Sequence, residues 1–175
     1  KIQSNVIYGS AMGRMADNLD YGMQKLPMDI YTPTGAGTAR PAVIYIHGGG
    51  FIGGSRTSVL AVEEANYWAS LGFVAFSIGY RNDGVAFLSE VGSVADAVHD
   101  AKAAVRYVKT HSESLGVDPN RIAVQGASAG AIIAASLSYV DEGDSGNAGP
   151  SSNVSAAIGL SGTIWPFLLK KKDSS

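Results

Sequence analysis

The stretch that decides the fold is RIAVQGASAGAIIAASLSY, residues 121–139. Residues 121–125 are largely apolar and predict a short strand, whereas the small apolar residues of 129–139 favour a helix. Between them lies Gly126-Ala127-Ser128-Ala129-Gly130. With 22 glycines and 20 serines in the chain, the Gly-x-Ser-x-Gly pattern alone is expected roughly 0.3 times by chance. Its position between a strand and a helix makes it specific.

A strand that turns sharply into a helix at a serine is a nucleophile elbow. The turn puts the serine in a strained backbone conformation and projects its hydroxyl from the carboxyl edge of the sheet. Side chains at Gly126 and Gly130 would collide with neighbouring strands, so glycine fits both places. The helix N-terminus adds unpaired N–H groups and positive potential, which favour a developing oxyanion. We therefore predict that Ser128 is a catalytic nucleophile.

A second motif, His47-Gly48-Gly49-Gly50-Phe51, follows the continuous apolar run Ala42–Ile46. That run is typical of a strand buried on both faces. Three glycines let backbone N–H groups approach a ligand without intervening side chains. The alternative is a flexible glycine turn with no functional role. A phosphate-binding loop is disfavoured, because no Gly-Lys-Ser/Thr follows and the spacing fits no dinucleotide fingerprint.

Strands and helices alternate along the rest of the chain. Strands are predicted at 26–31, 42–46, 73–78, 121–125 and 156–160, and helices at 59–71, 93–114 and 129–139. The helix at 93–114 carries one apolar stripe of Val94, Val98, Ala101, Val105 and Val108, while Asp96, Asp100, Lys102, Arg106 and Lys109 populate the rest of its circumference. This order predicts an α/β fold with a mostly parallel sheet and helices on both faces.

The paired motifs, 81 positions apart from His47 to Ser128, resemble those of α/β-hydrolase carboxylesterases of the hormone-sensitive-lipase and acetyl-esterase type. Residues 100–109 and 116–131 also match, and the likeness runs from about Leu26 to Leu160. The resemblance implies an α/β-hydrolase fold and a serine hydrolase cleaving carboxylic esters of short acyl chains. It implies Ser128 as nucleophile and the backbone N–H groups of Gly49, Gly50 and Ala129 as oxyanion hole. Peptidase, amidase and feruloyl-type activities stay open.

The family places its acid and its histidine after the serine, in the order Ser, Asp or Glu, His. None of the 47 residues after Ser128 is a histidine, so the chain is expected to be a single domain over 1–175, truncated after the strand that follows the elbow helix. His99 and His111 lie about 9 Å and about 27 Å down the predicted long helix from its start. His47 alone is expected at the active edge. It is the alternative base, although a structural role in the oxyanion loop is favoured.

Acids near the predicted site are Asp83 and Glu90 after a strand, and Asp141, Glu142 and Asp144 in a Gly- and Ser-rich loop, where solvated roles are expected. Three accounts therefore compete. The chain is a fragment of a longer esterase, or a shortened esterase completed by His47 or by a partner. Alternatively, it is a non-catalytic α/β scaffold that binds ligands or proteins.

Composition excludes several function classes. The chain has 175 residues, 46% of them hydrophobic, a mean hydropathy of +0.10 and a net charge of −2. Basic residues are scattered except at Lys170–Lys172, so no nucleic-acid partner is expected. No stretch is long enough to span a membrane, and there are no cysteines. No His/Asp/Glu cluster has metal-ligand spacing, so neither metal nor cofactor is expected. The chain starts at Lys1, which a signal peptide or trimming would each explain, so the compartment stays open.

The predicted strand 156–160 bears on whether the chain associates with other chains or segments. Complete relatives cover it with further strands, and an uncovered apolar edge recruits partners. We therefore expect a homo-oligomer, domain swapping or complementation by a missing C-terminal segment, in addition to a small-molecule ester substrate.

Overall fold

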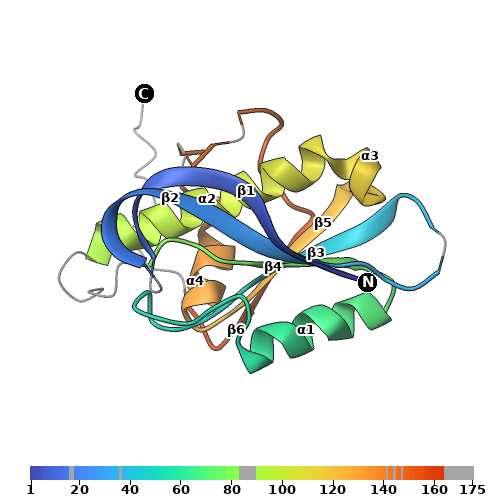
Figure 1. The fold of residues 1–175 in the computed structure, drawn as a ribbon, viewed down its shortest axis with the longest axis horizontal. Coiled ribbons are helices and arrows are strands. Elements are labelled where there is room, and N and C mark those ends of the chain that lie inside the picture. The colour runs from blue at the N-terminus through green and yellow to red at the C-terminus, as the bar shows by residue number, and fades with distance from the viewer. Residues whose placement is uncertain are drawn as a thin grey trace.

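A mixed six-stranded sheet with strand order β1-β2-β4-β3-β5-β6 organises the described chain (Figure 1). The computed structural model describes residues 1–15, 18–35, 37–82, 90–140, 142–143, 145–146 and 148–163, with only the backbone of 18–20 and 90–93. The strands are β1 (Ile2–Met15), β2 (Asn18–Tyr31), β3 (Arg40–Ile46), β4 (Val74–Ile78), β5 (Val117–Ala127) and β6 (Ala156–Leu160). β3 pairs in parallel with β4 and β5, and β5 with β6. The predicted mostly parallel α/β sheet is confirmed.

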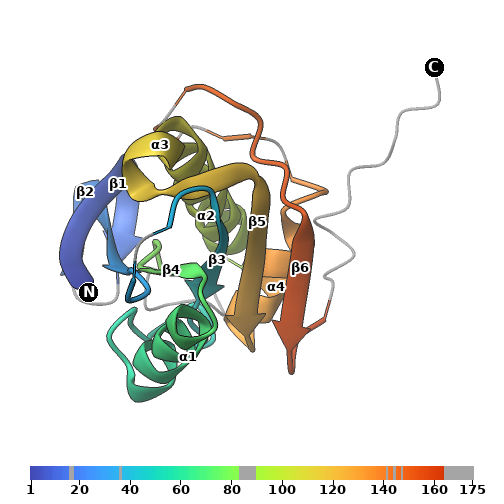
Figure 2. The same ribbon diagram turned by 90° about the vertical axis from the view of Figure 1, so that its right-hand side faces the viewer.

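Helices cover both faces of this sheet (Figure 2). They are α1 (Val59–Ser70), α2 (Glu90–Thr110), α3 (Ser112–Leu115) and α4 (Ala129–Ser136). α1 packs on one face, whereas α2 and α4 lie together on the other. Side chains alternate accordingly: on β3, Ile44 joins the large core under α2 and α4, while Val43 joins the smaller core under α1. Parallel neighbours require such crossovers, and their carboxyl ends meet at one edge of the sheet.

The N-terminal hairpin is the main element that the sequence did not predict. Only residues 26–31 of β2 were expected, yet β1 and β2 are antiparallel strands of 14 residues each. Their register shifts at three places, between Gln3 and Val6, Ile7 and Gly9, and Gly13 and Met15. Each bulge reverses which side chains face the core. The alternation of apolar and polar residues that predicts a strand is therefore lost.

The apolar stripe of α2 is buried as predicted, with Val94, Val98 and Val105 each at most 1% exposed. The remaining circumference is not simply solvated, because Asp100, Lys102 and Arg106 are 0%, 5% and 4% exposed. The segment that follows α4 covers them. Arg106 donates to the carbonyl oxygens of Glu142 and Gly146, and Lys109 donates to those of Ser151 and Asn153. Backbone carbonyl groups of this segment thus accept hydrogen bonds from the polar face of α2, which the sequence pattern placed in solvent.

The sheet of the described chain ends at β6, whose predicted bounds, 156–160, match the structure. All five of its residues are exposed, including Ile158 and Leu160 at 36% and 43%. Figure 2 shows this strand at the margin of the sheet, beside β5 and over α4. Among the described helices none is long and apolar enough to cross a membrane.

Candidate active site

Ser128 occupies the turn between β5 and α4, as the motif predicted. Its φ of 52° and ψ of −116° lie in a region that non-glycine residues rarely adopt. The surroundings hold it there: its N–H donates to the carbonyl oxygen of Leu160 on β6 (2.8 Å), and its own carbonyl accepts from Ala131 and Ile132 at the start of α4. The residue is exposed at the carboxyl edge of the sheet. Its hydroxyl is therefore accessible.

The two motif glycines are required by close backbone contacts. A Cβ on Gly130 would lie 2.0 Å from the carbonyl oxygen of Ile46, on the neighbouring strand β3, as expected. A Cβ on Gly126 would instead meet the carbonyl oxygen of Gly130 at 2.1 Å, which belongs to the elbow helix rather than to a strand. The elbow is thus pressed against β3 on one side and closed on itself on the other.

The loop from His47 to Gly54 runs directly against this elbow. A Cβ on Gly48 would lie 3.2 Å from the Cβ of Ser128 and 2.9 Å from the carbonyl oxygen of Ala127. The N–H groups of Ile52 and Gly53 both donate to the carbonyl oxygen of Gly49, at 3.1 and 3.0 Å, and so close a tight turn. This turn follows directly on Gly48, the residue of the loop that lies against Ser128.

Three backbone N–H groups near Ser128 are without a recorded partner in the described part of the chain: those of Gly49, Gly50 and Ala129. Ala129 is the first residue of α4, where an N–H has no partner within the helix. Backbone N–H groups without a partner can stabilise a developing oxyanion when they point at the reacting carbonyl oxygen. The sequence predicted these three N–H groups as the oxyanion hole, and that role stays a prediction.

The segment that leaves β4, residues 79–82, supports this loop from behind. Tyr80 is fully buried, its ring stacks on that of His47 with centroids 4.3 Å apart, and its hydroxyl donates to the carbonyl oxygen of His47 (2.9 Å). The side-chain amide of Asn82 donates to the carbonyl oxygen of Gly53 (3.0 Å). Sequence reasoning missed both residues. The available signal was their position directly after a strand next to the one that ends at His47.

His47 is built into the loop. It is 3% exposed, and its Nδ1–H donates to the carbonyl oxygen of Gly48 (2.7 Å), which leaves Nε2 as the basic nitrogen. Burial lowers the pKa of His47, and the nearby Arg56 lowers it further, against the opposing effect of the Gly48 hydrogen bond. The ring is therefore held neutral. Within the described chain no hydrogen bond joins it to Ser128, so its role as an alternative base stays a prediction.

The other candidates lie away from the elbow or outside the described residues. His111 follows α2 at the end of the sheet where β5 begins, opposite to Ser128, and its Nδ1–H donates to the carbonyl oxygen of Tyr107. His99 lies against Gly143. Asp83, Asp141 and Asp144 are outside the described residues, as is the side chain of Glu90.

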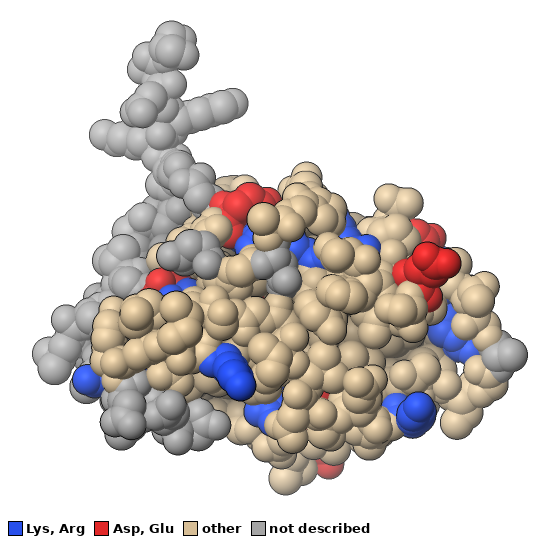
Figure 3. Space-filling model, turned by 45° about the horizontal axis from the view of Figure 1, so that its top comes forward, with Lys and Arg blue, Asp and Glu red and all other residues tan. Residues whose placement is uncertain are grey.

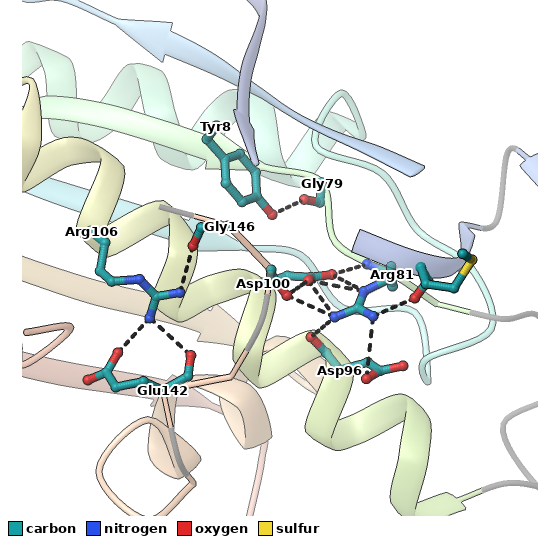
Figure 4. Close-up of polar contacts among 10 residues, drawn as sticks. Tyr8, Gly79, Arg81, Asp96, Asp100, Arg106, Glu142 and Gly146 are labelled. Atoms are coloured by element: carbon teal, nitrogen blue, oxygen red, sulfur yellow. Dashed lines mark hydrogen bonds and ion pairs between the residues drawn. The ribbon is translucent and has the colours of Figure 1, made fainter. Parts of the chain in front are cut away.

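Glu142 corrects the expectation of a simply solvated acid. Its carboxylate is half exposed but accepts from Arg106 at 2.5 Å (Figure 4). It also accepts from the Ser152 hydroxyl (2.8 Å) and lies 3.9 Å from Lys102. Three cations of α2 thus hold the loop that the sequence suggested would be flexible. None of these contacts involves Ser128.

A buried ion pair fixes the 79–82 segment to α2. Arg81 donates to the fully buried carboxylate of Asp100 through its backbone N–H (2.8 Å) and its guanidinium (2.8–3.1 Å). It also donates to the carbonyl oxygens of Met12 and Asp96 (Figure 4). Arg81 therefore ties together β1, α2 and the support of the oxyanion loop.

Surface charge and metal-ligating groups suggest no further centre. On the face shown in Figure 3, acidic and basic side chains are scattered among uncharged surface. Among the described residues, no group of three or more His, Asp or Glu side chains could hold a metal ion.

Comparison with known proteins places these features in a family. The BD-FAE family model matches residues 28–164. Phenmedipham hydrolase of Pseudarthrobacter oxydans is 34% identical over 113 residues, which cover 64% of this chain and 22% of that protein. Carboxylesterase NlhH of Mycobacterium tuberculosis is 32% identical over 119 residues, covering 68% of this chain and 35% of that protein.

Solved structures agree. The thermophilic esterase Est2 of Thermogutta terrifontis with propionate bound superposes with a TM-score of 0.69 at 32% identity, over 87% of this chain and 54% of that one. The same enzyme phosphonylated by cyclosarin gives 0.72 at 30% identity, over 93% and 56%. The chain thus spans about half of that structure and less of the curated relatives. It belongs to the BD-FAE family, within the α/β-hydrolase carboxylesterases.

Proposed function

We propose that this chain supplies the nucleophile and the oxyanion hole of a serine esterase that cleaves carboxylic esters. The observation that carries the proposal is the strained, exposed Ser128 beside three N–H groups without recorded partners in the described chain, those of Gly49, Gly50 and Ala129. Similarity to carboxylesterases supports the same reaction.

The reaction proceeds in two steps. The Ser128 oxygen attacks the ester carbonyl while its proton passes to a base, and the carbonyl oxygen becomes an anion held by the three N–H groups. Collapse expels the alcohol, which takes up the proton, and leaves an acyl-enzyme. Water then repeats the attack and releases the carboxylic acid. Each donor contributes roughly 3 kcal/mol of transition-state stabilisation.

The reaction needs a general base, and His47 is the one candidate that the described chain offers at this edge of the sheet. The Nδ1–H of His47 is engaged by Gly48, so a neutral His47 would accept the serine proton at Nε2. Its burial and its contact with Tyr80 equally suit a purely structural role. The other sources are the rest of a longer esterase, of which this chain would be a fragment, and a partner chain. Without any base, the serine hydroxyl stays protonated and weakly nucleophilic at neutral pH.

We propose a short-chain ester as the substrate. Est2, which resembles this chain, was solved with propionate bound. Ile52, three residues beyond Gly49 on the same loop, is 46% exposed and offers apolar surface on that loop. An acyl group of a few carbons fits such an open site better than a long chain, which needs a deep apolar channel.

A fluorophosphonate probe tests the nucleophile directly. We expect covalent labelling of the full chain at Ser128, found by peptide mass spectrometry, and none in Ser128→Ala. Ser138, in the same region of the chain, offers Ser138→Ala as a matched control that should label like wild type. If the chain stays unlabelled, Ser128 is not activated in this chain, which would favour a ligand- or protein-binding scaffold.

We also propose that β6 pairs with another strand, from a second copy of the chain or from a C-terminal segment. Its five exposed residues leave one side of the strand without a neighbour among the described residues.

A further inference from the structure

The turn at Gly49 needs an external support. Gly49, Gly50 and Phe51 have positive φ values of 126°, 62° and 61°. Glycine adopts such values readily, whereas Phe51 keeps its conformation only because the surrounding structure imposes it. The internal hydrogen bonds of the turn both end on one atom, the carbonyl oxygen of Gly49. The orientation of the N–H groups proposed to bind the oxyanion depends on this turn.

The carbonyl group of Gly53 packs directly against Gly49, the residue on which the turn is built. A Cβ on Gly49 would lie 2.1 Å from the Gly53 carbonyl oxygen, so that oxygen faces the Cα of Gly49 directly. Any rotation of the Gly53 peptide would therefore displace Gly49. The side-chain amide of Asn82 donates to this same oxygen at 3.0 Å.

Asn82 is itself held by rigid neighbours. It is 2% exposed, and its backbone N–H donates to the carbonyl oxygen of Arg14 on β1 (3.1 Å). The preceding residue, Arg81, is fixed by the buried Asp100 of α2 (Figure 4). The amide thus reaches the oxyanion loop from a segment that the ion pair prevents from moving.

We propose that Asn82 is a positioning residue for the oxyanion hole: its amide fixes the Gly53 carbonyl and thereby the turn that orients the N–H groups of Gly49 and Gly50. The inference rests on the proposed oxyanion role of those glycines. Asn82 acts through the backbone of the loop and touches no reacting atom.

The test is Asn82→Asp, which keeps the shape of the side chain but replaces the N–H donor with an acceptor that repels the Gly53 carbonyl. Asn66→Asp is the matched control, because Asn66 also donates its amide to a backbone carbonyl, that of Val62, on α1 away from the loop. Amide hydrogen exchange, resolved by NMR, is measured at Ile52 and Gly53, whose N–H groups close the turn. The N–H of Val62 is the internal reference.

In Asn82→Asp we expect exchange at Ile52 and Gly53 to accelerate by roughly fivefold to tenfold, with Val62 unchanged. Unchanged exchange at Ile52 and Gly53 would overturn the inference, as would an equal effect of Asn66→Asp. This readout does not need a working active site, so failure of the proposed esterase function would appear separately, as wild-type protein that neither labels nor hydrolyses ester.

With p-nitrophenyl butyrate as substrate, we expect Asn82→Asp to lower kcat by roughly tenfold to a hundredfold while KM changes little, because the loss falls on the transition state. A merely structural role would lower the melting temperature and leave kcat of the folded fraction intact. That outcome would contradict a positioning role even if exchange accelerated.

Discussion

The Cα of Gly130 is pressed against the strand beside the elbow, where a Cβ would lie 2.0 Å from the carbonyl oxygen of Ile46. A backbone oxygen in a paired strand cannot turn aside. Gly130→Ala must therefore push α4 away from β3 and displace Ser128, which begins the same turn. We expect it to destabilise the protein by roughly 2–3 kcal/mol and to slow labelling of Ser128 by a fluorophosphonate. Urea unfolding and labelling kinetics measure the two effects.

Gly22→Ala is the control for this substitution, since nothing lies within 4 Å of a Cβ at that position on β2. It should change stability by less than about 0.5 kcal/mol and leave the labelling rate untouched. Equal behaviour of the two alanine variants would mean that the elbow accommodates a side chain at residue 130.

The residues of the candidate site are of two kinds: those positioned by adjacent elements of the sequence, and those that contact the site from a distant segment. The position of Ser128 in a strand-turn-helix elbow could be predicted because the strand, the turn and the helix are contiguous in sequence. Gly49 and Gly50 follow a readable strand in the same way. Tyr80 and Asn82 could not be predicted, because they contact the loop from His47 to Gly54 from the segment that follows β4. Only the parallel pairing of β3 with β4 brings those segments together.

Among the helices and strands, those with a regular hydrophobic pattern could be predicted from the sequence. The bounds of β6 were predicted because a run of small apolar residues follows a polar loop. The stripe of α2 was readable from its spacing, but not the burial of Lys102 and Arg106, because their partners lie in a Gly- and Ser-rich loop without a recognisable pattern. The β1–β2 hairpin was hidden by its bulges.

The contact between that loop and α2 makes stability depend on pH. Burial alone would raise the pKa of Glu142, but hydrogen bonds from Ser152, the charge of Lys102 and a hydrogen bond from Arg106 outweigh it and lower the pKa below its ordinary 4.5. A carboxyl with a lowered pKa stabilises the fold above pH 4.5, and this contribution is lost as pH falls through the folded-state pKa.

Glu142→Gln should therefore lower the unfolding free energy by roughly 1 kcal/mol or less at neutral pH, because the carboxylate is half exposed. The difference from wild type should shrink steadily as the pH is lowered below 4.5. Thermal unfolding across pH measures it. The exposed Glu113 of α3 supplies Glu113→Gln as control, with a small effect at every pH. A Glu142→Gln deficit that persisted at the lowest pH would rule out ionisation as its cause.

At the scale of the whole molecule, the two margins of the sheet differ. β1, at one margin, is interrupted by three register shifts, and Asn5 within it has a φ of 59°. Bulges of this kind prevent a strand from pairing with another chain. β6, at the other margin, pairs with β5 in unbroken register and exposes all of its residues. Self-association through the sheet should therefore use β6 and not β1.

A second copy of the chain pairing along β6 would make the sheet continuous across a two-fold axis, as isologous dimers do. We expect sedimentation velocity to show a dimer that dissociates on dilution. Ile158→Lys places a charge on β6 and should shift the population to monomer. Ile7→Lys places the same charge on β1, where Ile7 is 44% exposed, and should leave the dimer intact. A wild-type chain that remains monomeric at high concentration, or an Ile7→Lys variant that dissociates as readily as Ile158→Lys, would show that this edge does not recruit a second copy.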